Sequence, residues 1–178
     1  MTGLFRKSIG NIRLVKLVYD ALDNTEDRAE DICNVAYNLQ QAYEKLLKAY
    51  LKDTEGHFAR THDIMQLYES AGVVDSTIAK YANKLTAWEA SVRYAEIDVD
   101  EEEAKYCYDY YWTAFQKYYN AAKVQSARVD RILTILRLPL SYSDLKVYLP
   151  EALPKDESEL NSIVKEAVKK YYENTGRS

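Results

Sequence analysis

Glycine and proline are scarce in this chain, with 5 and 3 occurrences in 178 residues. All-β domains need many tight turns, and these two residue types supply most of them. Their scarcity therefore argues against an all-β fold and predicts long helices joined by short loops. A chain of this length can bury an adequate core without disulfides or bound metal.

Cysteine and histidine are also rare, with two of each. Cys33 and Cys107 lie inside strongly helical stretches, so we expect two buried free thiols rather than a disulfide. No Cys-x-x-Cys pair or Cys/His ligand spacing occurs, which argues against a zinc site. The acidic run from Asp98 to Glu103 lacks the spacing and glycine of a calcium loop and is better explained as a helix start. We expect no metal and no cofactor.

The chain also lacks an excess of positive charge. Its 24 lysines and arginines face 28 acidic residues, which gives a net charge of -4 and a pI near 5.3. A general nucleic-acid binder normally has a basic surface, so only a local basic patch stays open. No apolar run is long enough to span a membrane, and the first residues do not form the apolar segment of a secretory signal. We therefore expect a cytoplasmic protein with no membrane contact.

Apolar residues recur at spacings of three and four through most of the chain, which predicts an all-α protein. Glycine, proline and capping residues divide this pattern into helices. The expected helices cover about residues 4–22, about 28–53, 62–71 with Thr61 as N-cap and Gly72 as stop, 76–94, 101–137 with Asp100 as N-cap, and 157–172. We expect an antiparallel helical bundle of about five helices plus a C-terminal helical extension.

Leu138-Pro139 should end the long helix, because proline disfavours helical geometry in the residue before it. Residues 139–156, with Pro150 and Pro154, should then form an irregular arm. The expected organisation is a helical bundle over residues 1–138, followed by the arm and last helix over 139–178. We expect the two parts to pack as one domain.

Tyrosine is abundant, with 17 residues, and many of them crowd the segment from Tyr106 to Tyr119. One helical face of this segment is apolar and should be buried. Tyr106, Tyr110 and Lys117 fall on a different face. Such residues can stack on bases, but aromatic side chains are also enriched at protein interfaces. We favour a homodimer interface.

The stretch from Asn38 to Leu51 reads Asn-Leu-Gln-Gln-Ala-Tyr-Glu-Lys-Leu-Leu-Lys-Ala-Tyr-Leu, and Arg60 to Ile64 reads Arg-Thr-His-Asp-Ile. In this order and spacing, the two stretches resemble the HEPN family (higher eukaryotes and prokaryotes nucleotide-binding). A third match is Arg93-Tyr94, although Ala95 stands where the family often has proline. The resemblance spans about residues 32–118. It implies an antiparallel helical bundle that is often dimeric.

The family includes RNA-cleaving toxins, partners of small nucleotidyltransferases and accessory domains of larger proteins. Its ribonucleases carry an Arg followed by four to six residues and then a His, which can move a proton beside a stabilised phosphate. Neither His57 nor His62 has an Arg at that distance, since only Thr61 separates Arg60 from His62. We therefore expect no catalytic residues. The expected function is a non-catalytic interaction or nucleotide-binding module, and the alternative is an atypical ribonuclease.

Several residues of the resembling stretches are candidates for binding a nucleotide, RNA or a partner protein, and each also has a simpler explanation. His62 can hydrogen-bond a neighbouring helix, Arg93 can complement a helix C-terminus, and Glu44 with Lys48 can form an exposed i,i+4 pair. The candidates are Arg60, His62, Arg93, Tyr94, Glu44, Lys45 and Lys48. The resemblance also implies a homodimer acting beside a nucleotidyltransferase or in a defence or toxin–antitoxin system.

Overall fold

The computed structural model describes residues 3–72, 74–94, 99–150 and 153–176, and it leaves the side chains of residues 90–94 undescribed. Within these ranges the chain is helical and has no strand, which confirms the all-α prediction. No helix in the same ranges is both long and apolar enough to cross a membrane. The elements are α1 (Gly3–Ala21), the short 3-10 helix η1 (Leu22–Asn24), α2 (Arg28–Thr54), α3 (Ile64–Ala71), α4 (Ser76–Ala79), α5 (Ala82–Tyr94), α6 (Glu101–Ile135), α7 (Tyr142–Leu145) and α8 (Glu157–Thr175).

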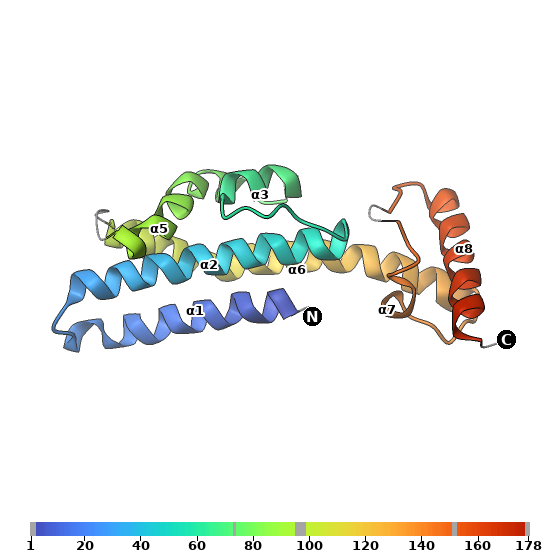
Figure 1. The fold of residues 1–178 in the computed structure, drawn as a ribbon, viewed down its shortest axis with the longest axis horizontal. Coiled ribbons are helices and arrows are strands. Elements are labelled where there is room, and N and C mark those ends of the chain that lie inside the picture. Colours follow the sequence, from blue (N-terminus) through green and yellow to red (C-terminus); the bar gives the residue numbers. More distant parts are fainter. Residues whose placement is uncertain (1–2, 73, 95–98, 151–152, 177–178) are drawn as a thin grey trace.

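Helix α2 is at the centre of the bundle and contacts α1, α3, α5 and α6. Figure 1 shows α1 and α2 as an antiparallel pair, with α6 running beside α2 and the α3–α5 segment lying over them. This arrangement explains why α2 is buried on several faces. The buried residues of α2 include polar ones, namely Gln40, Glu44 and Lys48.

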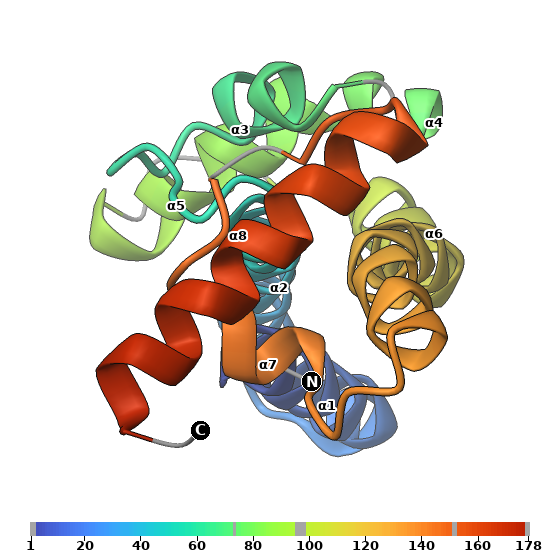
Figure 2. The ribbon, with the colours of Figure 1, turned by 90° about the vertical axis from the view of Figure 1, so that its right-hand side faces the viewer.

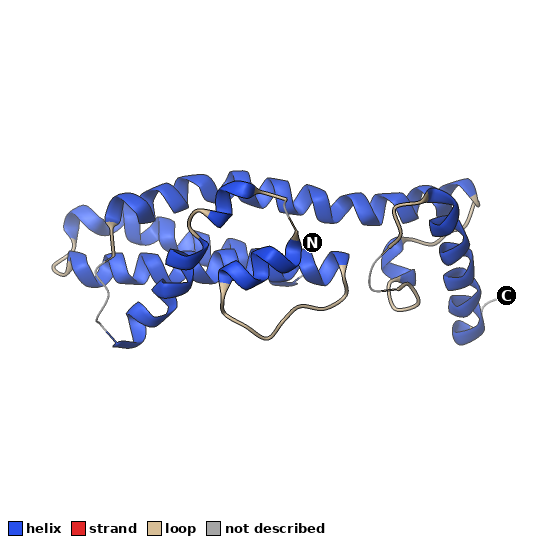
Figure 3. Cartoon of the chain, turned by 90° about the horizontal axis from the view of Figure 1, so that it is seen from above, coloured by secondary structure: helices blue, strands red, loops and turns tan. Residues whose placement is uncertain are grey.

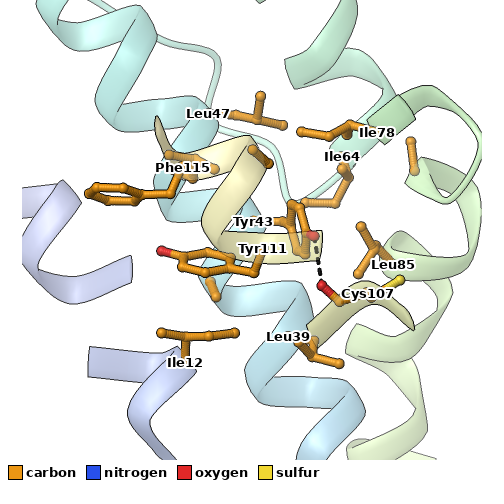
Figure 4. Packing of buried hydrophobic residues seen from close by; sticks show 14 of the residues in the cluster. Ile12, Leu39, Tyr43, Leu47, Ile64, Ile78, Leu85, Cys107, Tyr111 and Phe115 are labelled. Atoms are coloured by element: carbon orange, nitrogen blue, oxygen red, sulfur yellow. Dashed lines mark hydrogen bonds between the residues drawn. The ribbon is translucent and has the colours of Figure 1, made fainter. Parts of the chain in front are cut away.

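The main core combines aliphatic residues of α1, α2, α3 and α5 with aromatic residues of α6 (Figure 4). Tyr111 packs edge-to-face on Tyr43 with ring centroids 5.6 Å apart, an arrangement that the charge distribution of aromatic rings favours. The Tyr43 hydroxyl donates to the Cys107 carbonyl at 2.8 Å. The Ser8 hydroxyl contacts the Tyr111 hydroxyl at 2.5 Å, which ties α1 to α6.

Aspartate side chains cap most of the helix N-termini. Each accepts a hydrogen bond from a backbone N–H of the first turn, a group that would otherwise have no partner within the helix. These caps are Asp27, Asp63, Asp75, Asp100 and Asp156. Asp100 was correctly predicted to cap the long helix, α6. Thr61 was expected to cap α3, but Asp63 does so, and the Thr61 hydroxyl accepts from the Asp63 N–H instead.

The helix expected over residues 76–94 is divided in two. The amides of Lys80 and Tyr81 bond to carbonyls only three residues back, which tightens the chain into a turn after α4. Helix α5 then starts at Ala82. The apolar spacing in the sequence does not indicate this turn, because Ile78 before it and Ala82 after it are both buried.

Helix α6 ends before the proline that was expected to stop it. Arg137 has a left-handed backbone with a φ of 55°, and the Leu138 amide bonds back to the Leu133 carbonyl at 3.0 Å. This is the usual hydrogen-bond closure of a helix C-terminus, where glycine is the common residue. The helix therefore ends at Ile135 through its own closure, and Pro139 lies beyond it.

The last part of α6 belongs to a second, smaller core. Val129, Ile132 and Leu133 pack there with Leu145 of α7 and with residues of α8. Figure 3 shows α6 continuing past the end of α2 to reach these elements, and Figure 2 shows α8 lying across that end of the molecule. Because α6 contributes to both cores, the division at residue 138 falls directly after a shared helix. That division stays a prediction.

Candidate functional site

A stripe of three polar residues lies buried on α2. Gln40, Glu44 and Lys48 follow each other at intervals of four residues, so they lie on one face of the helix. Glu44 is 5 % exposed and Lys48 is 8 % exposed. Lys48 Nζ donates to one Glu44 oxygen at 2.7 Å, and Gln40 Nε2 donates to the other at 2.9 Å. We call these residues, together with His62, the α2 cluster.

His62 joins this cluster from the loop between α2 and α3. Its Nδ1 lies 3.0 Å from Glu44 Oε2 and 3.8 Å from Glu89 Oε1 of α5. Gln40 Nε2 also donates to the His62 backbone carbonyl at 3.3 Å, which holds the loop against α2. Because Asp63 directly follows and caps α3, the backbone of His62 lies at the start of that helix.

The ionised form of Glu44 is favoured in this setting. Burial alone would raise the pKa of its carboxyl, but hydrogen bonds from Lys48, Gln40 and His62 lower the pKa below its ordinary value of 4.5. The buried carboxylate thus has a donor at each oxygen, as a buried charge requires. Lys48 also lies over the Phe58 ring, 5.5 Å from its centroid.

The prediction of an exposed Glu44–Lys48 pair was wrong in one respect. The pair forms, but it is buried, because α3 and α5 cover this side of α2. Gln40 and Glu89 were not predicted as members of the site. Gln40 lies four residues before Glu44, so helical spacing alone was enough to indicate it. Glu89 lies far from the α2 stripe in sequence, and no local pattern indicates its position.

Three of the seven candidate residues thus come together: Glu44, Lys48 and His62. Lys45 points to α1 instead, where its Nζ donates to Asn11 Oδ1 at 2.7 Å. Arg60 is exposed to solvent. The side chains of Arg93 and Tyr94 lie outside the described residues.

The residues predicted to form a dimer interface have contacts within the chain. The Tyr110 hydroxyl and Lys117 Nζ donate to the Asp75 carboxylate at 2.9 and 3.0 Å, and Asp75 is 2 % exposed. Tyr106 stacks on Tyr110 with parallel rings 6.1 Å apart and is 43 % exposed. Tyr106 therefore still offers a surface, and the interface stays a prediction.

The cysteines are free, and Cys107 is buried while Cys33 is half-buried. Burial raises the pKa of the Cys107 thiol to about 12, which keeps it protonated and a poor nucleophile. Among the described residues, no group of three or more His, Cys, Asp or Glu side chains is arranged to hold a metal ion.

Comparison with known proteins gives one match. The family model for the HEPN domain matches residues 20–117, a range that includes the whole α2 cluster. No curated protein and no solved structure matches the chain. HEPN domains are in general nucleotide-binding or ribonuclease-like modules, and they often dimerise.

Proposed function

The chain belongs to the HEPN family, since the family model covers more than half of it, and from this premise we propose that it is a non-catalytic HEPN module. Such a module binds a nucleotide or a partner protein and cleaves nothing. We further propose that it works as a homodimer beside a nucleotidyltransferase or in a defence or toxin–antitoxin system. The resemblance of α2 and the Arg60–Ile64 segment to the family supports this assignment.

The surroundings of His62 carry the proposal. Cleavage of RNA needs an imidazole next to a group that stabilises the negative charge on phosphate. His62 instead faces two carboxylates, Glu44 at 3.0 Å and Glu89 at 3.8 Å. Lys48 forms an ion pair with Glu44, and the side chain of Arg60 is exposed to solvent. Among the described side chains, the imidazole is thus in contact with carboxylates rather than with a cation that could bind a phosphate.

We predict that the pure protein leaves RNA intact. The test is to incubate it with mixed RNA in the presence of a chelator and to follow the products by gel electrophoresis. The His62→Ala variant serves as the matched control for any trace of cleavage. Metal-independent cutting by the wild type that disappears in His62→Ala would falsify the proposal.

The same contact favours a second candidate, an atypical HEPN ribonuclease. A buried carboxylate that holds one imidazole nitrogen can orient the ring as a general base, and the His62 side chain is 59 % exposed. The Glu44→Gln variant distinguishes the two candidate functions. A ribonuclease loses activity in this variant, whereas a binding module has no activity to lose.

A further inference from the structure

A group of lysines surrounds two adjoining pockets where the bundle meets the C-terminal elements. The first pocket, of about 340 Å³, is lined by Lys123 and Lys146 together with Tyr119, Tyr142, Ser126 and Ser143. The second, of about 380 Å³, is lined by Lys7, Lys52 and Lys146. Lys146 lines both pockets, and we call the combined site the lysine pocket. Helices α1, α2 and α6 contribute to it, together with the start of α7 and Lys146 directly after that helix.

Positive charge in the lysine pocket is only partly neutralised. Asp53 pairs with Lys146, with 3.2 Å between Lys146 Nζ and Asp53 Oδ1. Lys52 donates to the Gly56 carbonyl, and Lys123 lies over the Tyr119 ring at 4.7 Å. Within the described ranges, no carboxylate pairs with Lys7, Lys52 or Lys123. The lysine pocket therefore contains four lysines and one carboxylate, although the net charge of the chain is -4.

The charge of Lys7 also reaches Lys45 on α2, which lies outside the lysine pocket. Burial lowers the pKa of Lys45, Glu44 opposes this effect, and the charges of Lys7 and Lys48 lower the pKa further. The charge of Lys7 thus acts on the adjacent face of α2. A negatively charged ligand would relieve this repulsion between like charges.

The lysines and the Ser143 hydroxyl of the lysine pocket suit phosphate oxygens. Ser143 brings a hydroxyl that can donate a hydrogen bond, whereas Ser126 and Tyr142 donate theirs to the carbonyls of Lys123 and Asp53. Lysine binds phosphate as a point charge. The pocket volumes are in the range of small-molecule sites. A long polyanion such as RNA needs an extended basic surface, and the acidic balance of the chain argues against one.

We propose that the lysine pocket binds a small ligand with a chain of linked phosphate groups. A single anionic group would meet only part of a charge that is spread over two adjoining pockets. The ligand would contact Lys52 of the bundle and Lys146 of the C-terminal elements at the same time. It would therefore add a further link between two parts of the molecule that already share α6 and the contacts of Tyr142 and Lys146 with Asp53. This inference deepens the ligand-binding part of the proposed function and rests on it.

The test is isothermal titration calorimetry on the full chain with inorganic tripolyphosphate and with ATP. We expect the wild type to bind, and we expect Lys123→Gln and Lys52→Gln each to weaken binding about tenfold, because each removes a charged contact to phosphate. Lys165→Gln changes an exposed lysine on α8 and is the matched control, expected to bind as the wild type does. Circular dichroism on each variant checks that it is folded.

The two probes separate the two sources of a phosphate chain. Equal affinity for both probes would show that the phosphates alone are recognised. Tighter binding of ATP would show that its adenine ring also contacts Tyr119 and Tyr142. Either result supports the proposal when it depends on Lys52 and Lys123. The proposal is overturned if neither probe binds at up to about 1 mM, if Lys165→Gln weakens binding as much, or if a single-stranded RNA binds more tightly through the same lysines. Any of these results leaves partner binding and the absence of RNA cleavage untouched, so failure here is distinct from failure of the proposed function.

Discussion

The carboxylate of Glu44 contacts three side chains, two from neighbouring turns of α2 and one from the loop between α2 and α3. Lys48, Gln40 and His62 all contact its two oxygens. Its pKa lies below 4.5, so its ionised form contributes stability that is complete above that pH and is lost as the pH falls through the lowered value. We predict that the urea midpoint of the wild type falls more steeply between about pH 5 and pH 3 than that of Glu44→Gln.

Glu102→Gln provides the control for this pH effect, since Glu102 is exposed at the start of α6. It should follow the wild-type curve at every pH. Parallel curves for the wild type and Glu44→Gln would show that Glu44 titrates as it does in the unfolded chain.

Only part of the α2 cluster was predictable from the sequence. Helical spacing places Glu44 beside Lys48, and the structure confirms this contact. The contact with His62 joins residues 18 positions apart across a loop, and no periodic pattern encodes such a pair. Burial of the cluster depends on α3 and α5 packing over α2, which is a tertiary effect.

At the scale of helices, Leu39 tests how α2 faces the core. This side chain is 0 % exposed in the main core. We predict that Leu39→Asp prevents stable folding, because a lone carboxylate would be buried without a partner. Glu102→Ala, at an exposed position, should change the melting temperature little. Thermal unfolding followed by circular dichroism compares them, and a Leu39→Asp melting temperature near that of the wild type would contradict the facing of α2.

Helix positions were more predictable than their ends. Apolar periodicity placed α1, α2, α6 and α8 correctly, since each has a continuous buried stripe. The turn at Lys80 was missed, because the spacing of buried residues continues through it. The end of α6 was misplaced because Arg137 occupies a left-handed position that glycine normally marks.

At the scale of the whole molecule, we predict a homodimer with Tyr106 in its interface. The aromatic residues of α6 exceed what the core accepts, since Tyr106 and Trp112 are 43 % and 45 % exposed. The competing possibility was that α8 folds back over them. In the described part of the chain, α8 packs instead on Val129 and Leu133, beyond the tyrosine-rich segment. Exposed apolar surface of this kind usually marks a contact site.

Light scattering on the full chain at tens of micromolar measures its mass directly. We expect the dimer mass for the wild type and a shift toward monomer for Tyr106→Glu, which places a charge in the interface. Glu102→Ala should keep the wild-type mass. A monomeric wild type would overturn the dimer prediction, and a dimeric Tyr106→Glu would move the interface to another surface.

The sharing of α6 between two cores has a consequence for how the molecule opens. The second core holds few buried side chains, and its links to the bundle include the Tyr142 and Lys146 contacts with Asp53. Regions with small cores open locally at a lower free energy than the whole chain. The amides of α8 should therefore exchange with solvent deuterium well before those of α2, while the first half of α6 keeps its protection. The chain would then behave as two cooperative units on one continuous helix, with a break in protection within α6 itself.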